Sequence, residues 1–295
     1  MRADSGLQAR MVLSFAVLAM LYIGFISVLA YLGVGFVPIT IIVSLMILAQ
    51  WYFSDRLVLW STGARVVTPE QAPRLYSITQ RVASRNGIRM PKLAIMNTSM
   101  PNAFATGRGQ GSSSVVAVTA GLLNLLDDEE LEGVIAHELA HIRHRDVLVL
   151  TLASLFSTVA WYLMQFGMFG AIGNRDSRNN GSGAWLLILL VAALTWFVSF
   201  LVIRAISRYR EYAADRGAAQ MTGRPGRLAS ALGKISGAMK RVPEQEAQRV
   251  EGMNAFFIIP ALSRGTIASL FSTHPPVDER IRRLLEMEKS LGPAA

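Results

Sequence analysis

Residues 137–146 read HELAHIRHRD and hold three of the chain's four histidines. His137 and His141 are four residues apart, so on an α-helix both imidazoles lie on one face and can share one zinc ion. Glu138, beside the first histidine, is placed to act as a base for a water that the ion activates. The stretch therefore predicts a helix that carries two metal ligands and a general base.

The residues before this stretch favour the helix. Four acidic side chains precede it, where the positive end of the helix dipole favours negative charge: Asp127, Asp128, Glu129 and Glu130. Leu131, Val134 and Ile135 then follow at helical spacing. Histidine pairs at this spacing also occur on protein surfaces and in cores without a metal. The scarcity of histidine and the acidic start favour the metal site.

The composition indicates a membrane protein without cysteine chemistry. The chain has 295 residues, of which 52% are hydrophobic and 17% charged, with a net charge of +9. Soluble proteins average about 25% charged residues. The absence of cysteine excludes disulfides, thiolate zinc sites and a cysteine nucleophile. A zinc ion would have to be held by histidine and carboxylate.

Long uncharged runs predict four transmembrane helices. Residues 11–54 contain no charged residue, which is enough for two spans of about 20 residues each, near 11–32 and 36–54. The first run exceeds the apolar core of a signal peptide. Two further spans are predicted near 147–169 and 184–203. The second pair could instead form a helical hairpin over the catalytic domain, or a re-entrant pair.

The predicted fold is an α-helical membrane protein with about four transmembrane helices and a small α+β, zincin-like (gluzincin) catalytic domain. Its segments are a membrane hairpin at 1–54, a first catalytic half at 55–146, a second hairpin at 147–203 and a second catalytic half at 204–295.

Three short strands are expected before the metal helix, at 92–96, 101–107 and 114–119. The last of them could form a sheet edge beside the cleft and bind an extended peptide through main-chain hydrogen bonds. It could equally be a core strand. Val116 and Ala117 are candidate substrate-binding residues under the first alternative.

A catalytic zinc needs a third protein ligand, and Glu211 is the best candidate. It follows the predicted fourth span, which returns the chain to the side of the metal helix. Asp215, one turn later, could accept the free ring N–H of a ligand histidine. His144 is a rival ligand, but three histidines along one helix rarely converge on one ion, because the outer pair is about 10 Å apart.

Two further polar residues are given roles. His274 is followed by two prolines, which stiffen its turn, and is a candidate donor to the oxyanion of an acyl-transfer transition state. Asp146 is predicted to cap a local basic cluster or to pair with Arg143 or Arg145.

The distribution of arginine predicts the membrane orientation. Many arginines flank the spans on the side of the catalytic halves: Arg2, Arg10, Arg56, Arg65, Arg204, Arg208 and Arg210. The predicted loop on the other side carries only Arg175 and Arg178. The positive-inside rule then places the catalytic domain in the cytoplasm. Because topology accounts for the basic balance, no nucleic-acid partner is expected.

These motifs together resemble the HtpX family of membrane-bound zinc metallopeptidases, which are relatives of the CAAX prenyl proteases. The matching stretches are HELAHIRHRD at 137–146, EYAAD at 211–215, PNAFA at 101–105 and STHPP at 272–276 followed by Arg280. The resemblance covers nearly the whole chain, and the combination of motifs is highly specific.

The resemblance implies one Zn²⁺ per chain, with His137, His141 and Glu211 as ligands. It implies Glu138 as the catalytic base and Asp215 as the partner of a ligand. By the same resemblance His274 and Arg280 line the site, and Asn102 lies by the substrate strand. It also implies quality control of misfolded or membrane proteins at the cytoplasmic face of the cell membrane.

Three other functions are considered. A prenyl-protein (CAAX-type) protease would share the same site, but it would need a large intramembrane chamber. A non-catalytic zinc-binding membrane scaffold would keep the ligands and lose the base, and the presence of Glu138 argues against it. A channel or transporter would need ionisable residues inside the apolar runs, which have none.

Overall fold

The computed structural model describes residues 5–31, 41, 44, 45, 48, 49, 51–151, 153, 158, 161, 182–242 and 274–291. Contacts divide the chain into two units. We call residues 52–148 and 207–295 the sheet unit, and residues 2–51 and 149–206 the apolar unit. The predicted spans near 36–54 and 147–169 fall largely outside the described residues.

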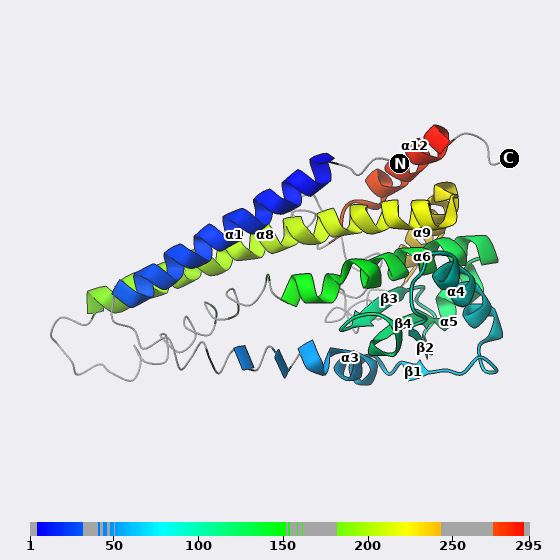
Figure 1. Ribbon diagram of the computed structural model, residues 1–295, viewed down its shortest axis with the longest axis horizontal. Helices are drawn as coiled ribbons and strands as arrows, with labels where there is room; N and C mark the ends of the chain where they lie inside the picture. The colour runs from blue at the N-terminus through cyan, green and yellow to red at the C-terminus, as the bar shows by residue number, and fades with distance from the viewer. Residues whose placement is uncertain are drawn as a thin grey trace. The chain divides into compact units, whose positions relative to one another are not determined.

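The sheet unit contains a four-stranded sheet in the order β1-β2-β4-β3 (Figure 1). Its strands are β1 (Arg65–Val66), β2 (Lys92–Met96), β3 (Ala103–Gly107) and β4 (Ser114–Thr119). β4 pairs in parallel with β2 and antiparallel with β3, so that Val116 lies opposite Leu93 on one side and Ala105 on the other. β1 pairs antiparallel with β2.

The edge position considered for residues 115–119 is wrong. β4 is hydrogen-bonded to a strand on each side, and all six of its residues are buried. Val116 and Ala117 therefore cannot offer free main-chain groups to a peptide. A run of β-branched residues predicts a strand but not its neighbours, because strand order depends on residues far away in the sequence. Among the described strands, β1 and β3 occupy the edges.

The helices of the sheet unit pack on the sheet and on one another. In chain order they are α3 (Ser54–Thr62), α4 (Pro73–Arg85), the 3₁₀ turn η1 (Gly111–Ser113), α5 (Ala120–Leu125), α6 (Asp128–His144), α9 (Pro225–Met239) and α12 (Val277–Leu291). α6 packs on β3 and β4, α4 and α9 pack on α6, and α12 packs on α9. The predicted metal helix is thus at the centre of the unit.

α6 begins with a reciprocal cap. Asp127 accepts the backbone N–H of Glu130 at 2.9 Å, and the Glu130 carboxylate accepts the backbone N–H of Asp127 at 3.1 Å. The other contacts of the buried Glu130 come from α9, where Ser230 and Lys234 each donate to it at 2.7 Å. The acidic start therefore both caps the helix and ties it to α9.

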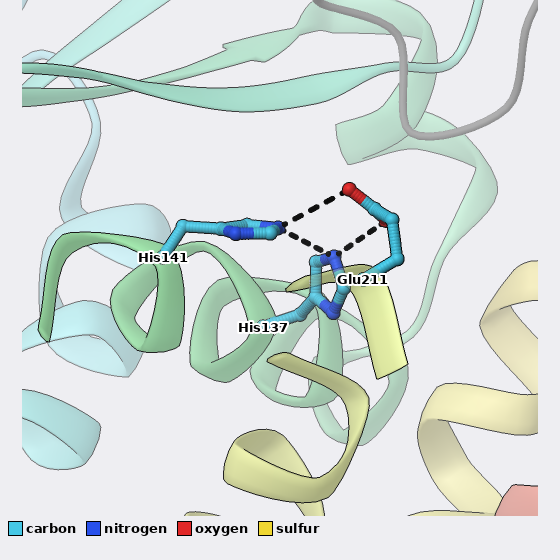
Figure 2. Close-up of side chains that lie close together, drawn as sticks. All are labelled: His137, His141 and Glu211. Atoms are coloured by element: carbon cyan, nitrogen blue, oxygen red, sulfur yellow. Dashed lines mark hydrogen bonds and ion pairs between the residues drawn. The ribbon is translucent and has the colours of Figure 1, made fainter. Parts of the chain in front are cut away.

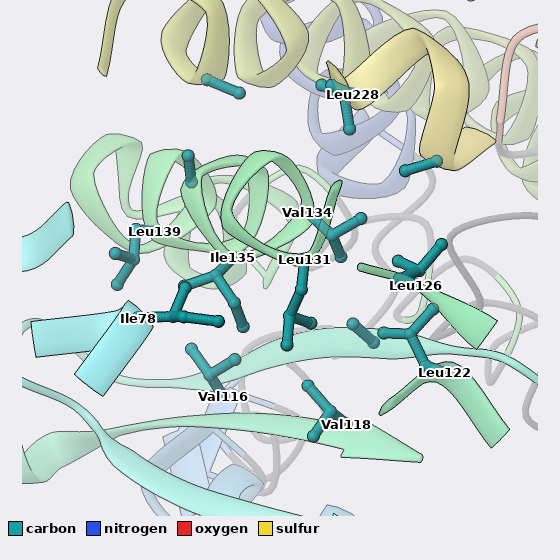
Figure 3. Packing of buried hydrophobic residues seen from close by; sticks show 14 of the residues in the cluster. Ile78, Val116, Val118, Leu122, Leu126, Leu131, Val134, Ile135, Leu139 and Leu228 are labelled. Carbon is teal, nitrogen blue, oxygen red and sulfur yellow. The ribbon is translucent and has the colours of Figure 1, made fainter. Parts of the chain in front are cut away.

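The core lies between α6 and the sheet. Leu131, Ile135 and Leu139 recur every four residues on one face of α6 and point toward Val116 and Val118 of β4 (Figure 3). All five side chains are almost completely buried. Truncation of such a leucine to alanine typically costs about 2–5 kcal/mol. The metal-motif residues are thus carried by a helix that is anchored along its length.

The apolar unit contains α1 (Ser5–Tyr31) and the first part of α8 (Ser182–Thr222), a continuous helix of 41 residues. Tyr22 packs with Ala153 and Ile206, and its hydroxyl donates to the carbonyl of Ala153 at 2.7 Å. Within the described part of the chain, Leu189–Thr222 is long and apolar enough to cross a membrane by length and composition. Its mean hydropathy reaches 2.3.

One face of α8 exposes large apolar side chains at spacings of three and four residues: Leu186, Leu190, Leu194, Phe197 and Leu201. Each is at least 40% exposed. A continuous apolar stripe of this kind is typical of a surface that contacts lipid or another protein.

Candidate metal centre

Three side chains from two helices meet at the HELAH motif. α6 supplies His137 and His141, α8 supplies Glu211, and one ligand atom from each lies within 4.8 Å of the others (Figure 2). The Nε2 atoms of the two histidines are 3.1 Å apart. Glu211 directs Oε2 toward His137 at 3.5 Å and Oε1 toward His141 at 3.6 Å. His144 is exposed and lies outside this group.

A glycine in α8 allows α6 and α8 to approach closely enough for their side chains to form one group. A Cβ atom added to Gly217 of α8 would lie 2.8 Å from the Cβ of Ala140 in α6, which is closer than two carbons can pack. Ala140 directly precedes His141, and Gly217 follows Glu211 by less than two turns. The spacing of the candidate ligands therefore depends on a position with no side chain.

Asp215 lies beside Nδ1 of His137, the ring nitrogen that is not directed at the candidate metal position. Its Oδ1 lies 3.0 Å from His137 Nδ1. The fully buried Arg280 of α12 donates to both oxygens of Asp215, from Nη2 at 2.7 Å and from Nε at 2.9 Å. Arg280 Nη1 is also 3.3 Å from Glu211 Oε2. The predicted partnership of Asp215 with a histidine thus has a geometric basis, and Arg280 fixes both carboxylates.

Asp146 does not pair with Arg143 or Arg145 as predicted. Its Oδ2 contacts Nδ1 of His141, and its Oδ1 lies 2.9 Å from Nε of Arg210. The reason is backbone geometry: α6 ends with Arg145 in the left-handed region, at φ 55° and ψ 42°, which turns Asp146 back toward the helix. No glycine marks this turn in the sequence, so the contact could not be read from local pattern.

The surroundings shift the pKa values of the site residues in different directions. Burial raises the pKa of Glu138, and the neighbouring His137 and His141 oppose that rise. Burial also raises the pKa of Asp146, but the contacts with His141 and Arg210 outweigh it and lower the value to about 2. For His137, burial lowers the pKa, yet the carboxylates of Asp215 and Glu211 raise it to about 9. A bound metal ion would have to displace a proton there.

The remaining predicted residues take different places. His274 Nδ1 lies 3.4 Å from Glu211 Oε2, so the proline-flanked turn borders the group. Asn102 is buried directly before β3, and its backbone is fixed by Thr119, whose hydroxyl accepts the Asn102 N–H at 2.9 Å. Val116 and Ala117 are inside the sheet.

The residues fit a divalent metal ion. Both histidines have Nδ1 against a carboxylate, which leaves both Nε2 atoms directed at the space beside Glu211. Glu211 Oε2 is buried and lies 3.3–3.5 Å from nitrogens of Arg280, His274 and His137, but it forms no hydrogen bond among the described residues. A buried carboxylate oxygen with nearby positive charge and no hydrogen bond is still able to bind a metal ion. Two imidazoles and a carboxylate are a common ligand set for catalytic zinc.

Comparison with known sequences identifies the family. The sequence pattern of peptidase family M48 matches residues 69–288. The chain belongs to peptidase family M48.

Relatives within family M48 are similar over almost the full chain. Protease HtpX homolog 2 of Methanosarcina mazei is 48% identical over 290 residues, 98% of each chain. Protease HtpX homolog of Moorella thermoacetica is 49% identical over 294 residues, 98% of this chain and 97% of that one. Protease HtpX homolog 1 of Streptomyces coelicolor is 40% identical over 99% of this chain and 96% of its own. The predicted membership of the HtpX family is confirmed.

A solved structure supports the fold. The crystal structure of S. mikatae Ste24p aligns with a TM-score of 0.56 and 19% identity, covering 92% of this chain and 64% of that chain. Membership of family M48 and the similarity to the HtpX proteases, and not this likeness of fold, make the chain a membrane metallopeptidase that acts on proteins. The group of His137, His141 and Glu211 could hold its metal ion.

Proposed function

We propose that this M48 peptidase is a zinc-dependent endopeptidase that cleaves misfolded or membrane proteins at the cytoplasmic face of the cell membrane. The observation that carries the proposal is the meeting of His137, His141 and Glu211, with their ligand atoms within 4.8 Å of one another. Three protein ligands leave a position open for water or substrate, as catalytic zinc sites require.

The ligand set favours zinc. Imidazole nitrogen and carboxylate oxygen suit zinc, and the chain contains no cysteine that would favour a softer site. When bound, zinc supplies Lewis acidity: it polarises the scissile carbonyl and lowers the pKa of water toward about 7. The other chemical steps belong to the chain's own residues.

Glu138 is the proposed general base. It follows the first histidine on α6, is 3% exposed, and lies in the electrostatic field of His137, His141 and Arg280. We assign it the proton of the attacking water, which it then passes to the leaving amine. His274 borders the group and is the proposed donor to the oxyanion.

The proposed substrate position is beside β3. Asn102 directly precedes this strand, which lies at one edge of the described sheet. A peptide laid along an edge strand is bound through main-chain hydrogen bonds, and so with little dependence on its sequence. Such binding suits an enzyme that removes diverse damaged proteins. Arg280 holds Asp215 and Glu211 and is proposed to support the ligands rather than to touch substrate.

The decisive experiment compares detergent-purified full-length wild type with Glu138→Gln. Zinc is measured by elemental analysis, and cleavage of an unfolded protein is measured with and without a chelator. We expect about one zinc per chain in both proteins, cleavage by wild type alone, and loss of that cleavage with the chelator. Zinc-loaded wild type that cleaves only farnesylated tetrapeptides would overturn the broad-substrate proposal. Absence of zinc would overturn the metal assignment.

Cysteine labelling tests the proposed position of the sheet unit on the cytoplasmic side of the membrane. Because the chain has no cysteine, single cysteines can be labelled without a background. Ser77→Cys on α4 and Ser290→Cys on α12 lie at exposed positions of the sheet unit. With a membrane-impermeant maleimide we expect both to react only after cell lysis, and Ser177→Cys in the predicted opposite loop to react in intact cells. The reverse pattern would place the site outside the cytoplasm.

A further inference from the structure

The pair formed by Asp146 and Arg210 lies beside Nδ1 of His141 and takes no part in the proposed peptide cleavage. Asp146 contacts the Nδ1 atom of this histidine with one oxygen and lies 2.9 Å from Arg210 Nε with the other. The Asp146 side chain is 4% exposed and that of Arg210 is 9% exposed. Both groups are therefore held away from solvent, where an ion pair is screened little and a lost partner is costly.

The backbone is bent to make this contact. Arg145 is the one non-glycine residue with positive φ among the residues that the structure describes. A left-handed residue with a side chain costs about 1–2 kcal/mol relative to its usual conformation. The turn directs Asp146 back to a histidine five residues earlier in the chain. A strained turn that ends in a buried contact with a candidate ligand points to a role in the site.

The pair also joins the two helices that carry the ligands. Asp146 follows the end of α6, and Arg210 directly precedes Glu211 in α8. We propose that the Asp146–Arg210 pair positions His141: Asp146 accepts the Nδ1–H, which leaves Nε2 free to bind the metal, and Arg210 fixes Asp146 to the helix of the third ligand. The proposal rests on the proposed function, because it requires His141 to be a ligand.

The arrangement repeats that of the other histidine. His137 has Asp215 at its Nδ1, and Asp215 is held by Arg280. Outer carboxylates of this kind set the tautomer and the orientation of a ligand ring, and their loss typically lowers metal affinity about 10–100-fold. Asp146 is therefore a positioning residue that acts through His141, and it does not touch substrate.

The test measures metal binding rather than turnover alone. Full-length wild type, Asp146→Ala and Asp146→Asn are titrated with zinc against a chromophoric chelator, and the visible spectrum of the Co²⁺-loaded proteins is recorded. We expect about 10–100-fold weaker zinc binding and an altered cobalt spectrum for Asp146→Ala. Asp146→Asn should lose less, because its amide oxygen can still accept the ring N–H.

The chain offers a matched control. Asp128 also lies on α6 and pairs with an arginine, since Arg74 Nε is 2.6 Å from its Oδ1, but its side chain is 67% exposed. Asp128→Ala should bind zinc as wild type does. Melting of the metal-free proteins shows whether each variant is folded, so a loss of zinc in a folded Asp146 variant supports the positioning role.

A double variant separates the two members of the pair. If Arg210 acts through Asp146, the Arg210→Ala change should alter zinc affinity in wild type and have little further effect in Asp146→Ala. An undiminished Arg210→Ala effect in that background would overturn the pairing. Zinc binding by Asp146→Ala as tight as wild type would sink the positioning role while leaving the proposed function intact. Failure of wild type itself to bind zinc would instead remove the proposed function.

Discussion

At the scale of single residues, each candidate ligand histidine has a carboxylate beside one of its two ring nitrogens. Asp215 lies at Nδ1 of His137 and Asp146 at Nδ1 of His141. A neutral imidazole whose Nδ1 carries the proton has its lone pair on Nε2. Both Nε2 atoms lie beside Glu211. The carboxylates therefore determine that a metal ion would meet the Nε2 lone pair of each ring.

The left-handed conformation of Arg145 makes a stability prediction. Arg145→Gly should raise the melting temperature of the metal-free protein, because relief of the left-handed strain (about 1–2 kcal/mol) exceeds the entropy cost of glycine (about 0.5–1 kcal/mol). Arg143→Gly, two residues earlier within α6, should lower the melting temperature, because glycine inside a helix costs about 1 kcal/mol of stability. Differential scanning calorimetry measures both. Equal destabilisation by the two variants would show that Arg145 carries no strain.

Local spacing predicted some site residues and could not predict others. The four-residue intervals from His137 to His141 and from Glu211 to Asp215 are properties of one helix each, so they can be read from the sequence. The contact of Asp146 with His141 depends on a left-handed arginine where a glycine would have been the usual signal. The partnership with Arg210 joins residues 64 positions apart through tertiary packing.

At the scale of elements, the metal group depends on the distance between α6 and α8. Gly217 allows that approach, since any Cβ there would meet Ala140 at 2.8 Å. The strands show the corresponding limit of sequence reasoning. Residues 92–96 and 114–119 form strands as predicted, but the central place of β4 comes from pairing with both β2 and β3. β1 has two residues, too few for a sequence pattern.

Gly217→Ala should weaken zinc binding and lower stability. Alanine favours a helix by about 1 kcal/mol over glycine, but overpacking at a contact of this kind costs about 1–3 kcal/mol. Gly233→Ala in α9 is the matched control, because no atom lies within 4 Å of its added Cβ. The control should gain stability and keep zinc. A stabilising effect of both substitutions would show that the helices separate without cost.

Helix α12 carries a pH-dependent contribution to stability. Hydrogen bonds from Arg282 and then Arg283 lower the pKa of Glu279 from 4.5 to about 2. A lowered folded-state pKa means that the ion pairs stabilise the fold fully above about pH 4.5 and cease to do so as the pH falls through about 2.

Glu279→Gln should therefore lower the melting temperature by about 2 °C at pH 7 and by less at pH 3. Asp278→Asn, the same charge change one residue earlier, controls for a general effect of charge. A Glu279→Gln difference that stays constant from pH 7 to pH 3 would contradict the assignment.

At the scale of the whole molecule, the core of the sheet unit does not depend on the metal group. The cluster around Leu131, Ile135 and Leu139 faces the sheet, and the candidate ligands come from another face of α6. A folded metal-free protein is the consequence, in contrast to small domains that fold only around zinc.

Removal of zinc should accordingly leave the secondary structure intact. After chelation we expect an unchanged far-ultraviolet circular dichroism spectrum, a melting temperature lower by about 5–10 °C, and full recovery when zinc is restored; the shift corresponds to saturation at about 100 times the dissociation constant. Loss of helical signal on chelation would show that the ion holds the fold together.

The carboxylate–arginine pairs also set the charge balance of the buried centre. Its carboxylates are those of Glu138, Asp146, Glu211 and Asp215, and its guanidinium groups are those of Arg210 and Arg280. With neutral histidines, these side chains carry two more negative charges than positive ones. One divalent cation makes the centre electroneutral, whereas a monovalent or trivalent ion would leave a net charge buried away from water, at high cost. A divalent cation would therefore match the net charge of this centre as well as its nitrogen and oxygen ligands.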